Sequence, residues 1–148
     1  METRQALETA MRDAMRSRNE IALRTIRMVV SAIKFTEIEK GKPLDEAGIQ
    51  SILQKEIKSR REAIAEAEKA ARPDLAEAGK AEVTILEAYL PKQLSEDDLT
   101  ALVKAAIAET GAAGPSDLGK VMKAALPKIQ GRAPGDVVSA AVRKILAG

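Results

Sequence analysis

The chain has 148 residues and a formal net charge of +2, and 45% of its residues are hydrophobic while only 1% are aromatic. Cysteine and histidine are both absent, which excludes a disulfide scaffold, a zinc site built on Cys or His, and every nucleophile–histidine catalytic pair. Abundant alanine and scarce aromatic residues argue against an all-β fold. No apolar run approaches the roughly 20 residues that span a bilayer.

Apolar residues at helical spacing predict two helices near the N-terminus. The first is expected over residues 3–17, with its charged side chains on the opposite side. Asn19 is a suitable N-cap for the second, which we expect to end near Gly41 as a left-handed C-cap. The run Val29-Val30 could also indicate a strand, but the flanking period of about 3.6 residues favours a helix.

Two further helices are expected before residue 91. Asp45 is a suitable N-cap for a long helix, which Pro73 should end because the residue before a proline is disfavoured in helical geometry. Asp74 with Glu77 resembles a capping box that starts a fourth helix, whose apolar stripe runs to Leu90.

The sequence places its clearest domain boundary after residue 90. Pro91 cannot continue a helix, and Ser95 caps a new one within five residues. We therefore predict an N-terminal helical domain over residues 1–90, a joint over 91–94 and a C-terminal domain over 95–148.

Three short helices are expected in this C-terminal part. The first ends at Gly111, the second runs from Ser116 to just before Pro127, and the third runs from about Pro134 to Leu146. Each has one apolar face, so the three should pack around a small core. The predicted fold is all-α, with a four-helix region followed by a three-helix domain.

Residue chemistry predicts no active site, no metal site and no cofactor. Gly119-Lys120 lacks the preceding glycine-rich loop that phosphate-binding nucleotide motifs require. Glu82 falls inside the apolar arc of the fourth helix, where we interpret it as half of an ion pair with Arg or Lys of a neighbouring helix.

A cationic group in the last third of the chain is the best candidate for binding. Residues 99–148 carry 7 basic and 3 acidic side chains, whereas residues 1–98 carry 17 and 19. Two of its lysines share a helix face, a glycine lies in the first turn of that helix, and a cationic turn follows the helix. Together these features could bind the phosphates of an RNA backbone. The candidates are Gly119, Lys120, Lys123, Lys128, Gly131 and Arg132. Helix capping, a tight turn and solvated lysines are the structural alternative.

Three segments resemble the GatB/YqeY family: Leu90–Ser95, Asp117–Met122 and Gly131–Ala133. The resemblance implies an all-helical protein whose tail is similar to the C-terminal domain of the B subunit of glutamine-dependent aspartyl/glutamyl-tRNA amidotransferase, where the tail contacts tRNA. It marks the glycines and cations of the latter two segments as tRNA-facing, while Met122 fits a core position better. Pro134 stands where such proteins commonly carry a capping Asp.

The leading hypothesis is a non-catalytic, tRNA-associated helical protein. By resemblance the family's activity would be that of a carbon–nitrogen ligase with glutamine as amido-N donor, but the chain contains no ATP-binding or amidase segment. One alternative is an accessory component of such amide transfer, and another is a helical protein–protein adaptor, which an uncovered apolar patch on the first or second helix would favour. We expect tRNA and proteins of aminoacyl-tRNA metabolism as partners, no membrane, and a cytoplasmic location because the N-terminus lacks signal-peptide features.

Overall fold

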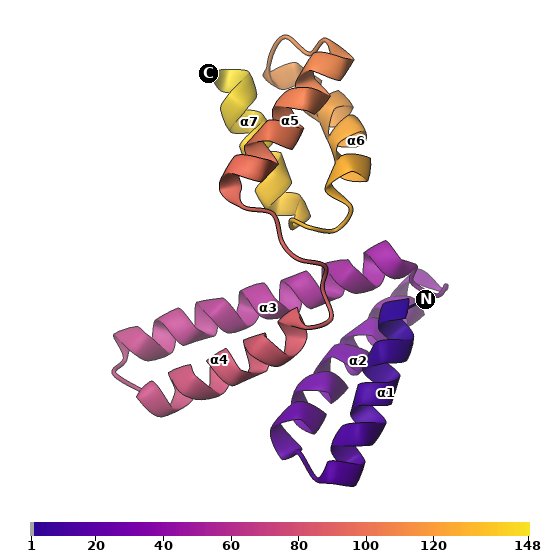
Figure 1. Ribbon diagram of the computed structural model, residues 1–148, viewed down its shortest axis with the longest axis vertical. Helices are drawn as coiled ribbons and strands as arrows, with labels where there is room; N and C mark the ends of the chain where they lie inside the picture. The colour runs from indigo at the N-terminus through magenta and orange to yellow at the C-terminus, as the bar shows by residue number, and fades with distance from the viewer. Residues whose placement is uncertain (1) are drawn as a thin grey trace. The chain divides into compact units, whose positions relative to one another are not determined.

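The computed structural model describes residues 2–148, and within them every regular element is a helix (Figure 1). The prediction of an all-α protein is therefore confirmed. In chain order the elements are α1 (Glu2–Ser17), α2 (Glu20–Lys40), α3 (Glu46–Lys69), α4 (Pro73–Glu87), α5 (Glu96–Thr110), the short 3₁₀ helix η1 (Pro115–Asp117), α6 (Leu118–Ile129) and α7 (Gly135–Ala147).

The local chemistry of the chain fixes most of these boundaries. Side-chain oxygens of Asn19, Asp45 and Ser95 each accept a hydrogen bond from the backbone N–H three residues later, as predicted for N-caps. Gly41 and Gly111 end their helices at φ values of 69° and 67°, the left-handed region that a glycine enters without a Cβ clash.

The predicted start of the fourth helix at a capping box is wrong. Helix α4 begins at Pro73 and not at a capping box, because proline is pre-organised for the first helical turn. Asp74 lies inside that turn, where its carboxylate pairs with the Arg72 guanidinium at 3.1 Å. Helix α7 starts at Gly135, one residue after the predicted start near Pro134, which is its N-cap residue.

Helix α6 also departs from its predicted range. It starts at Leu118 after the 3₁₀ turn and continues through Pro127 to Ile129. Proline removes one hydrogen bond from the last turn, but stopping the helix there would leave Ile129 outside the core, and this side chain is only 1% exposed. Gln130, with φ of 55°, follows as the C-cap, so the helix ends three residues later than expected.

The chain divides into two compact units, Met1–Leu90 and Pro91–Gly148. In the first, α1 packs on α2 and α3 packs along α4 (Figure 1). Gly79 allows the close approach of α3 and α4, since a Cβ there would lie 2.6 Å from Cγ1 of Ile64. The buried core of this unit consists of Leu7, Ile26, Val29, Ile33, Leu44, Ile49, Leu53, Ile57, Val83 and Leu86.

The second unit packs α5, α6 and α7 around a core of smaller side chains. The Leu94 N–H donates to the Arg132 carbonyl at 2.7 Å, which ties the start of this unit to the turn between α6 and α7. Over residues 2–148, no helix combines the length and the apolar composition of a membrane span. The buried core of the second unit consists of Leu99, Val103, Ala106, Val121, Ala125, Ile129, Ala133, Val138 and Val142.

Candidate functional site

Lys120 and Lys123 lie on the exposed side of α6. Both side chains are exposed, while Val121 and Ala125 between and beyond them are buried in the core. Neither lysine forms an ion pair with any residue that the structure describes. The pair therefore presents two uncompensated positive charges, one helical turn apart, to a partner.

The start of α6 is less open to an anion than the sequence indicated. Gly119 is exposed, and a Cβ added there would meet nothing within 4 Å. The Leu118 N–H, however, already donates to the Pro115 carbonyl, and the Asp117 carboxylate accepts the Ala113 N–H at 3.0 Å. A negative side chain thus occupies the positive end of the helix that a phosphate would approach.

The other two cationic candidates are engaged within the second unit. Nζ of Lys128 lies 2.9 Å from Oε2 of Glu109 on α5. The Arg132 guanidinium turns back to the end of α6, donating from Nε to the Ile129 carbonyl at 2.9 Å and from Nη2 to the Lys128 carbonyl at 2.8 Å. These contacts cap the helix and bridge two helices, which gives both residues a structural role.

Gly131 also has a structural reason to be glycine. Its φ is 75°, and its carbonyl accepts a hydrogen bond from Nε2 of Gln93 at 3.2 Å. Together with the bond from Leu94 to Arg132, this holds the first residues of the unit against the turn. The six predicted residues thus divide into an exposed group on α6 (Gly119, Lys120 and Lys123) and a structural turn (Lys128, Gly131 and Arg132).

Glu82 is the centre of a polar network in the first unit, as predicted. Its Oε2 accepts from Nε of Arg60 on α3 at 2.9 Å, and its Oε1 lies 3.3 Å from Nη2 of Arg24 on α2. Arg60 is only 7% exposed and also pairs with Glu56 at 2.7 Å. The network links α2, α3 and α4 and has the form of a structural ion-pair cluster.

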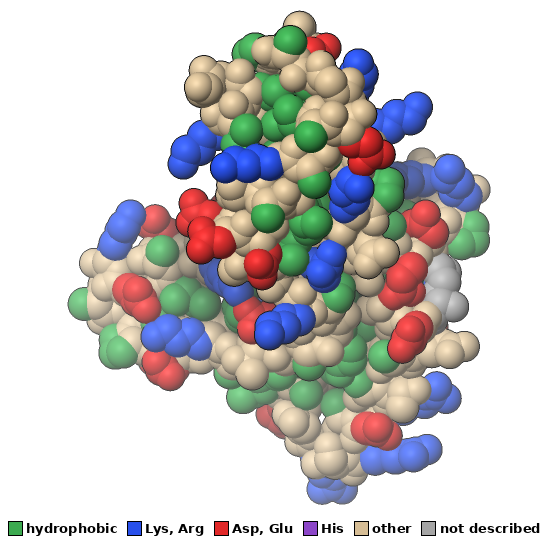
Figure 2. Space-filling view, turned by 45° about the horizontal axis from the view of Figure 1, so that its top comes forward, with side chains coloured by type: hydrophobic (Ala, Val, Ile, Leu, Met, Phe, Trp, Pro, Cys, Tyr) green, Lys and Arg blue, Asp and Glu red, His purple; other side chains and the backbone are tan. Residues whose placement is uncertain are grey.

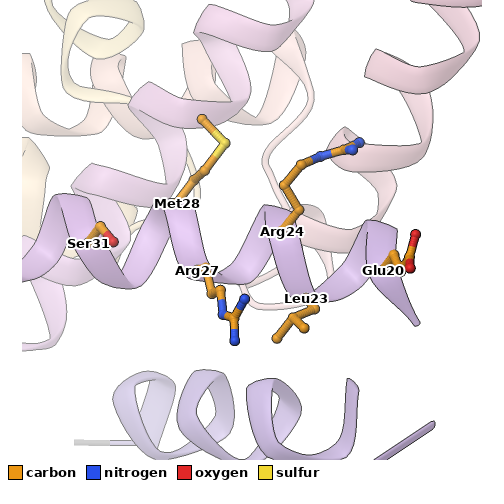
Figure 3. Close-up of a pocket in the computed structure, with 6 residues that line it drawn as sticks. All are labelled: Glu20, Leu23, Arg24, Arg27, Met28 and Ser31. Atoms are coloured by element: carbon orange, nitrogen blue, oxygen red, sulfur yellow. The ribbon is translucent and has the colours of Figure 1, made fainter. Parts of the chain in front are cut away.

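An open hollow of about 720 Å³ lies along one face of α2, in the first unit. Figure 3 shows Arg24, Arg27 and Met28 projecting from this helix. The hollow combines apolar side chains with guanidinium groups, a mixture that suits an amphipathic ligand. Its lining residues are Glu20, Leu23, Arg24, Arg27, Met28 and Ser31.

The same face of α2 carries large hydrophobic side chains that the core does not cover. Ile21, Met28, Phe35 and Ile38 are 45%, 52%, 63% and 79% exposed, and we refer to these four residues as the α2 stripe. Sequence reasoning identified only the buried face of this helix. The missed signal is a second set of apolar residues at spacings of seven and three, a repeat typical of helix–helix contact surfaces.

Figure 2 shows Lys and Arg side chains interspersed with Asp and Glu side chains over the drawn face. Within residues 2–148, no group of three or more acidic side chains is placed to hold a metal ion.

Comparison with known proteins finds one family whose model, described as "Yqey-like protein", matches residues 4–146. A protein of Pyrenophora tritici-repentis named "Altered inheritance of mitochondria protein 41, mitochondrial" is 32% identical over 144 residues, covering 95% of this chain and 78% of the relative. The protein of the same name from Lachancea thermotolerans is 33% identical, covering 74% of this chain and 60% of the relative. An uncharacterized protein of Schizosaccharomyces pombe is 30% identical over 56% of this chain and 68% of the relative.

These relatives correct one expectation. The predicted cytoplasmic location is contradicted, because the relatives from Pyrenophora and Lachancea are named as mitochondrial proteins. The expectation rested on the lack of signal-peptide features at the N-terminus.

Proposed function

Because the chain belongs to the YqeY-like family, we propose that it is a non-catalytic, tRNA-associated helical protein. In this proposal its C-terminal unit contacts the phosphate backbone through Lys120 and Lys123. The observation that carries the proposal is the exposure of these two lysines, one turn apart on α6, without an ion-pair partner among the described residues. The excess of basic residues over 99–148 supports it. The chain has one Phe, one Tyr and no Trp, so recognition would depend on phosphate and helix shape and not on base stacking.

Binding of bulk tRNA across a salt series tests this function. We expect Lys120→Glu/Lys123→Glu to weaken binding at low salt and to reduce the slope of log affinity against log salt by about two, one for each lost phosphate contact. The control is Arg143→Glu/Lys144→Glu, which makes the same charge change at two exposed residues of α7. Absence of tRNA binding at low salt, or equal weakening by both double variants, would contradict the proposal.

An accessory role in glutamine-dependent amide transfer is supported only by the resemblance of the tail motifs. We expect the purified chain to release no ammonia from glutamine by itself, because the sequence has no Cys or His and its serines are scattered singly, without a glycine–serine cluster of the amidase kind. A coupled ammonia assay measures this, and glutamine turnover by the chain alone would overturn the non-catalytic assignment.

A protein–protein adaptor is the second candidate function. It is favoured by the α2 stripe, because side chains as large as Phe35 and Ile38 are exposed one turn apart on one helix face, and exposed apolar patches mark interaction sites. This function places the binding surface in the first unit and is independent of the α6 lysines.

A further inference from the structure

The α2 stripe is positioned as a preformed surface. Buried Val29 and Ile33 hold the opposite face of α2 in the core, and Arg24 links the helix to α4 through Glu82. From Ile21 to Ile38 the stripe extends about 26 Å, at 1.5 Å per residue. A partner helix of about five turns would match this length.

Cationic side chains accompany the stripe along most of its length. Arg24, Arg27 and Lys34 are exposed on the same solvent-facing side of α2, and the first two line the hollow described above. Arg24 shares Glu82 with the buried Arg60, whereas Arg27 and Lys34 form no ion pair with any described residue. The acidic residues of α2 are Glu20 and Glu39, exposed near the two ends of the stripe, and the half-buried Glu37, which pairs with Arg4 of α1.

We propose that the α2 stripe docks an amphipathic helix of a partner protein whose apolar face is bordered by Asp or Glu side chains. The partner's apolar residues would contact Met28, Phe35 and Ile38, and its acids would meet the guanidinium and ammonium groups alongside. Apolar contact supplies most of the affinity, while complementary charge selects the partner and its register. This inference rests on the adaptor function and specifies the chemistry of its partner.

A second copy of the chain is a poorer occupant of the same surface. A parallel pairing of two α2 helices would place Arg24, in the middle of the stripe, against its own counterpart. An antiparallel pairing that matches Ile21 with the second copy's Ile38 would bring Arg27 beside the second copy's Lys34. Like charges face one another in either case, which disfavours self-association.

The test uses three synthetic helical peptides of about 18 residues, the length that covers the stripe. All three carry Leu at positions spaced by three and four residues, and the flanking positions are Glu in the first, Lys in the second and Gln in the third. Binding to the full chain is measured by fluorescence anisotropy. We expect the Glu peptide to bind about tenfold or more tightly than the Lys peptide, with the Gln peptide between them.

Two variants and two matched controls assign the surface. Phe35→Ser/Ile38→Ser should weaken all three peptides by about tenfold or more, and Arg27→Glu/Lys34→Glu should abolish or reverse the preference for the Glu peptide. Leu75→Ser removes an apolar side chain of α4 that is 52% exposed, and Arg143→Glu/Lys144→Glu repeats the charge change on α7. Both controls should bind the peptides like the unmodified chain.

Each other outcome overturns the inference in a distinguishable way. Equal binding of the three peptides would leave the adaptor function intact but refute the acidic partner. If none of the three peptides binds, both the adaptor function and the acidic partner are refuted. A dimer of the chain in analytical ultracentrifugation that Phe35→Ser/Ile38→Ser dissociates would refute both as well. Displacement of the Glu peptide by tRNA, together with loss of tRNA binding in Arg27→Glu/Lys34→Glu, would assign the surface to RNA.

Discussion

The two units of this protein hold their helices together by different means. In the first, ion pairs join neighbouring helices: Arg4 of α1 with Glu37 of α2 at 2.6 Å, Arg60 of α3 with Glu82 of α4 at 2.9 Å, and Lys80 of α4 with Glu68 of α3 at 3.4 Å. These pairs lie around a core rich in Ile and Leu.

The second unit also has an ion pair between helices, Lys128 of α6 with Glu109 of α5 at 2.9 Å, but it depends more on its turns and caps. Its helices are 12 to 15 residues long, and its buried side chains are mostly Val and Ala. The Arg132 side chain caps α6, and the backbone of the same turn receives Leu94. The comparison indicates that a cationic side chain can stabilise the fold as readily as it can bind a partner. The sequence alone does not distinguish these two roles.

The largest effect should come from breaking the buried network in the first unit. Arg60→Ala leaves the carboxylates of Glu82 and Glu56 without their buried partner and removes the packed stem of the side chain, so we expect a loss of about 3 kcal/mol in the free energy of unfolding. Urea unfolding followed by circular dichroism and by the fluorescence of Tyr89, the single tyrosine, measures it.

Arg61→Ala is the matched control for this variant. Arg61 also pairs across α3 and α4, with Glu87, but its side chain is 62% exposed, and exposed pairs contribute little. A loss as large as that of Arg60→Ala would show that burial is not what makes the network important.

Glycine-to-alanine substitution should change the free energy of unfolding in opposite directions in the two units. Gly79→Ala gains helix propensity but forces its Cβ against Ile64 at the α3–α4 contact, so we expect a net loss of about 1 kcal/mol. Gly119→Ala meets open space on α6 and should stabilise by about 0.5–1 kcal/mol. Thermal and urea unfolding of both variants provide the measurement.

If Gly119→Ala stabilises the fold yet weakens tRNA binding, close approach of a phosphate at this position is supported.

The smallest effect concerns pH and the link between α1 and α2. The Arg4 guanidinium and the Leu44 N–H donate to Glu37 and hold the pKa of its carboxyl below the ordinary value of 4.5. Because the pKa of the Glu37 carboxyl is lower in the folded chain than in the unfolded chain, the ionised carboxylate stabilises the fold at pH values above 4.5. This stabilisation is lost as the pH falls through the lower pKa of the folded state. Glu37→Gln should therefore be less stable than the unmodified chain at pH 7, and the difference should shrink towards pH 3.

Urea midpoints at several pH values measure this convergence. Glu62→Gln, at an exposed position of α3, makes the same charge change away from the Arg4 contact and serves as the control. A gap between Glu37→Gln and the unmodified chain that stays constant from pH 7 to pH 3 would contradict the assigned role of Glu37.

Much of the fold follows from local sequence chemistry. Asn19, Asp45 and Ser95 start helices and Gly41 and Gly111 end them, because each capping interaction lies within a few residues along the chain. The proline boundaries were predicted less well. At Pro127 the burial of Ile129 outweighs the local preference to stop the helix, and burial depends on α5 and α7 as well as on α6.

The sequence by itself determined the helical class, most helix ends and the pairing of Glu82 with a cation, since these depend on spacing along one or two helices. Tertiary structure alone decided which cations face solvent. Lys120 and Lys128 are equally charged in the sequence, but only Lys128 comes within reach of Glu109 when α5 and α6 pack. Tertiary structure also decided that α2 buries one apolar face and leaves the α2 stripe uncovered. The neighbouring helices of the first unit can cover only one side of α2.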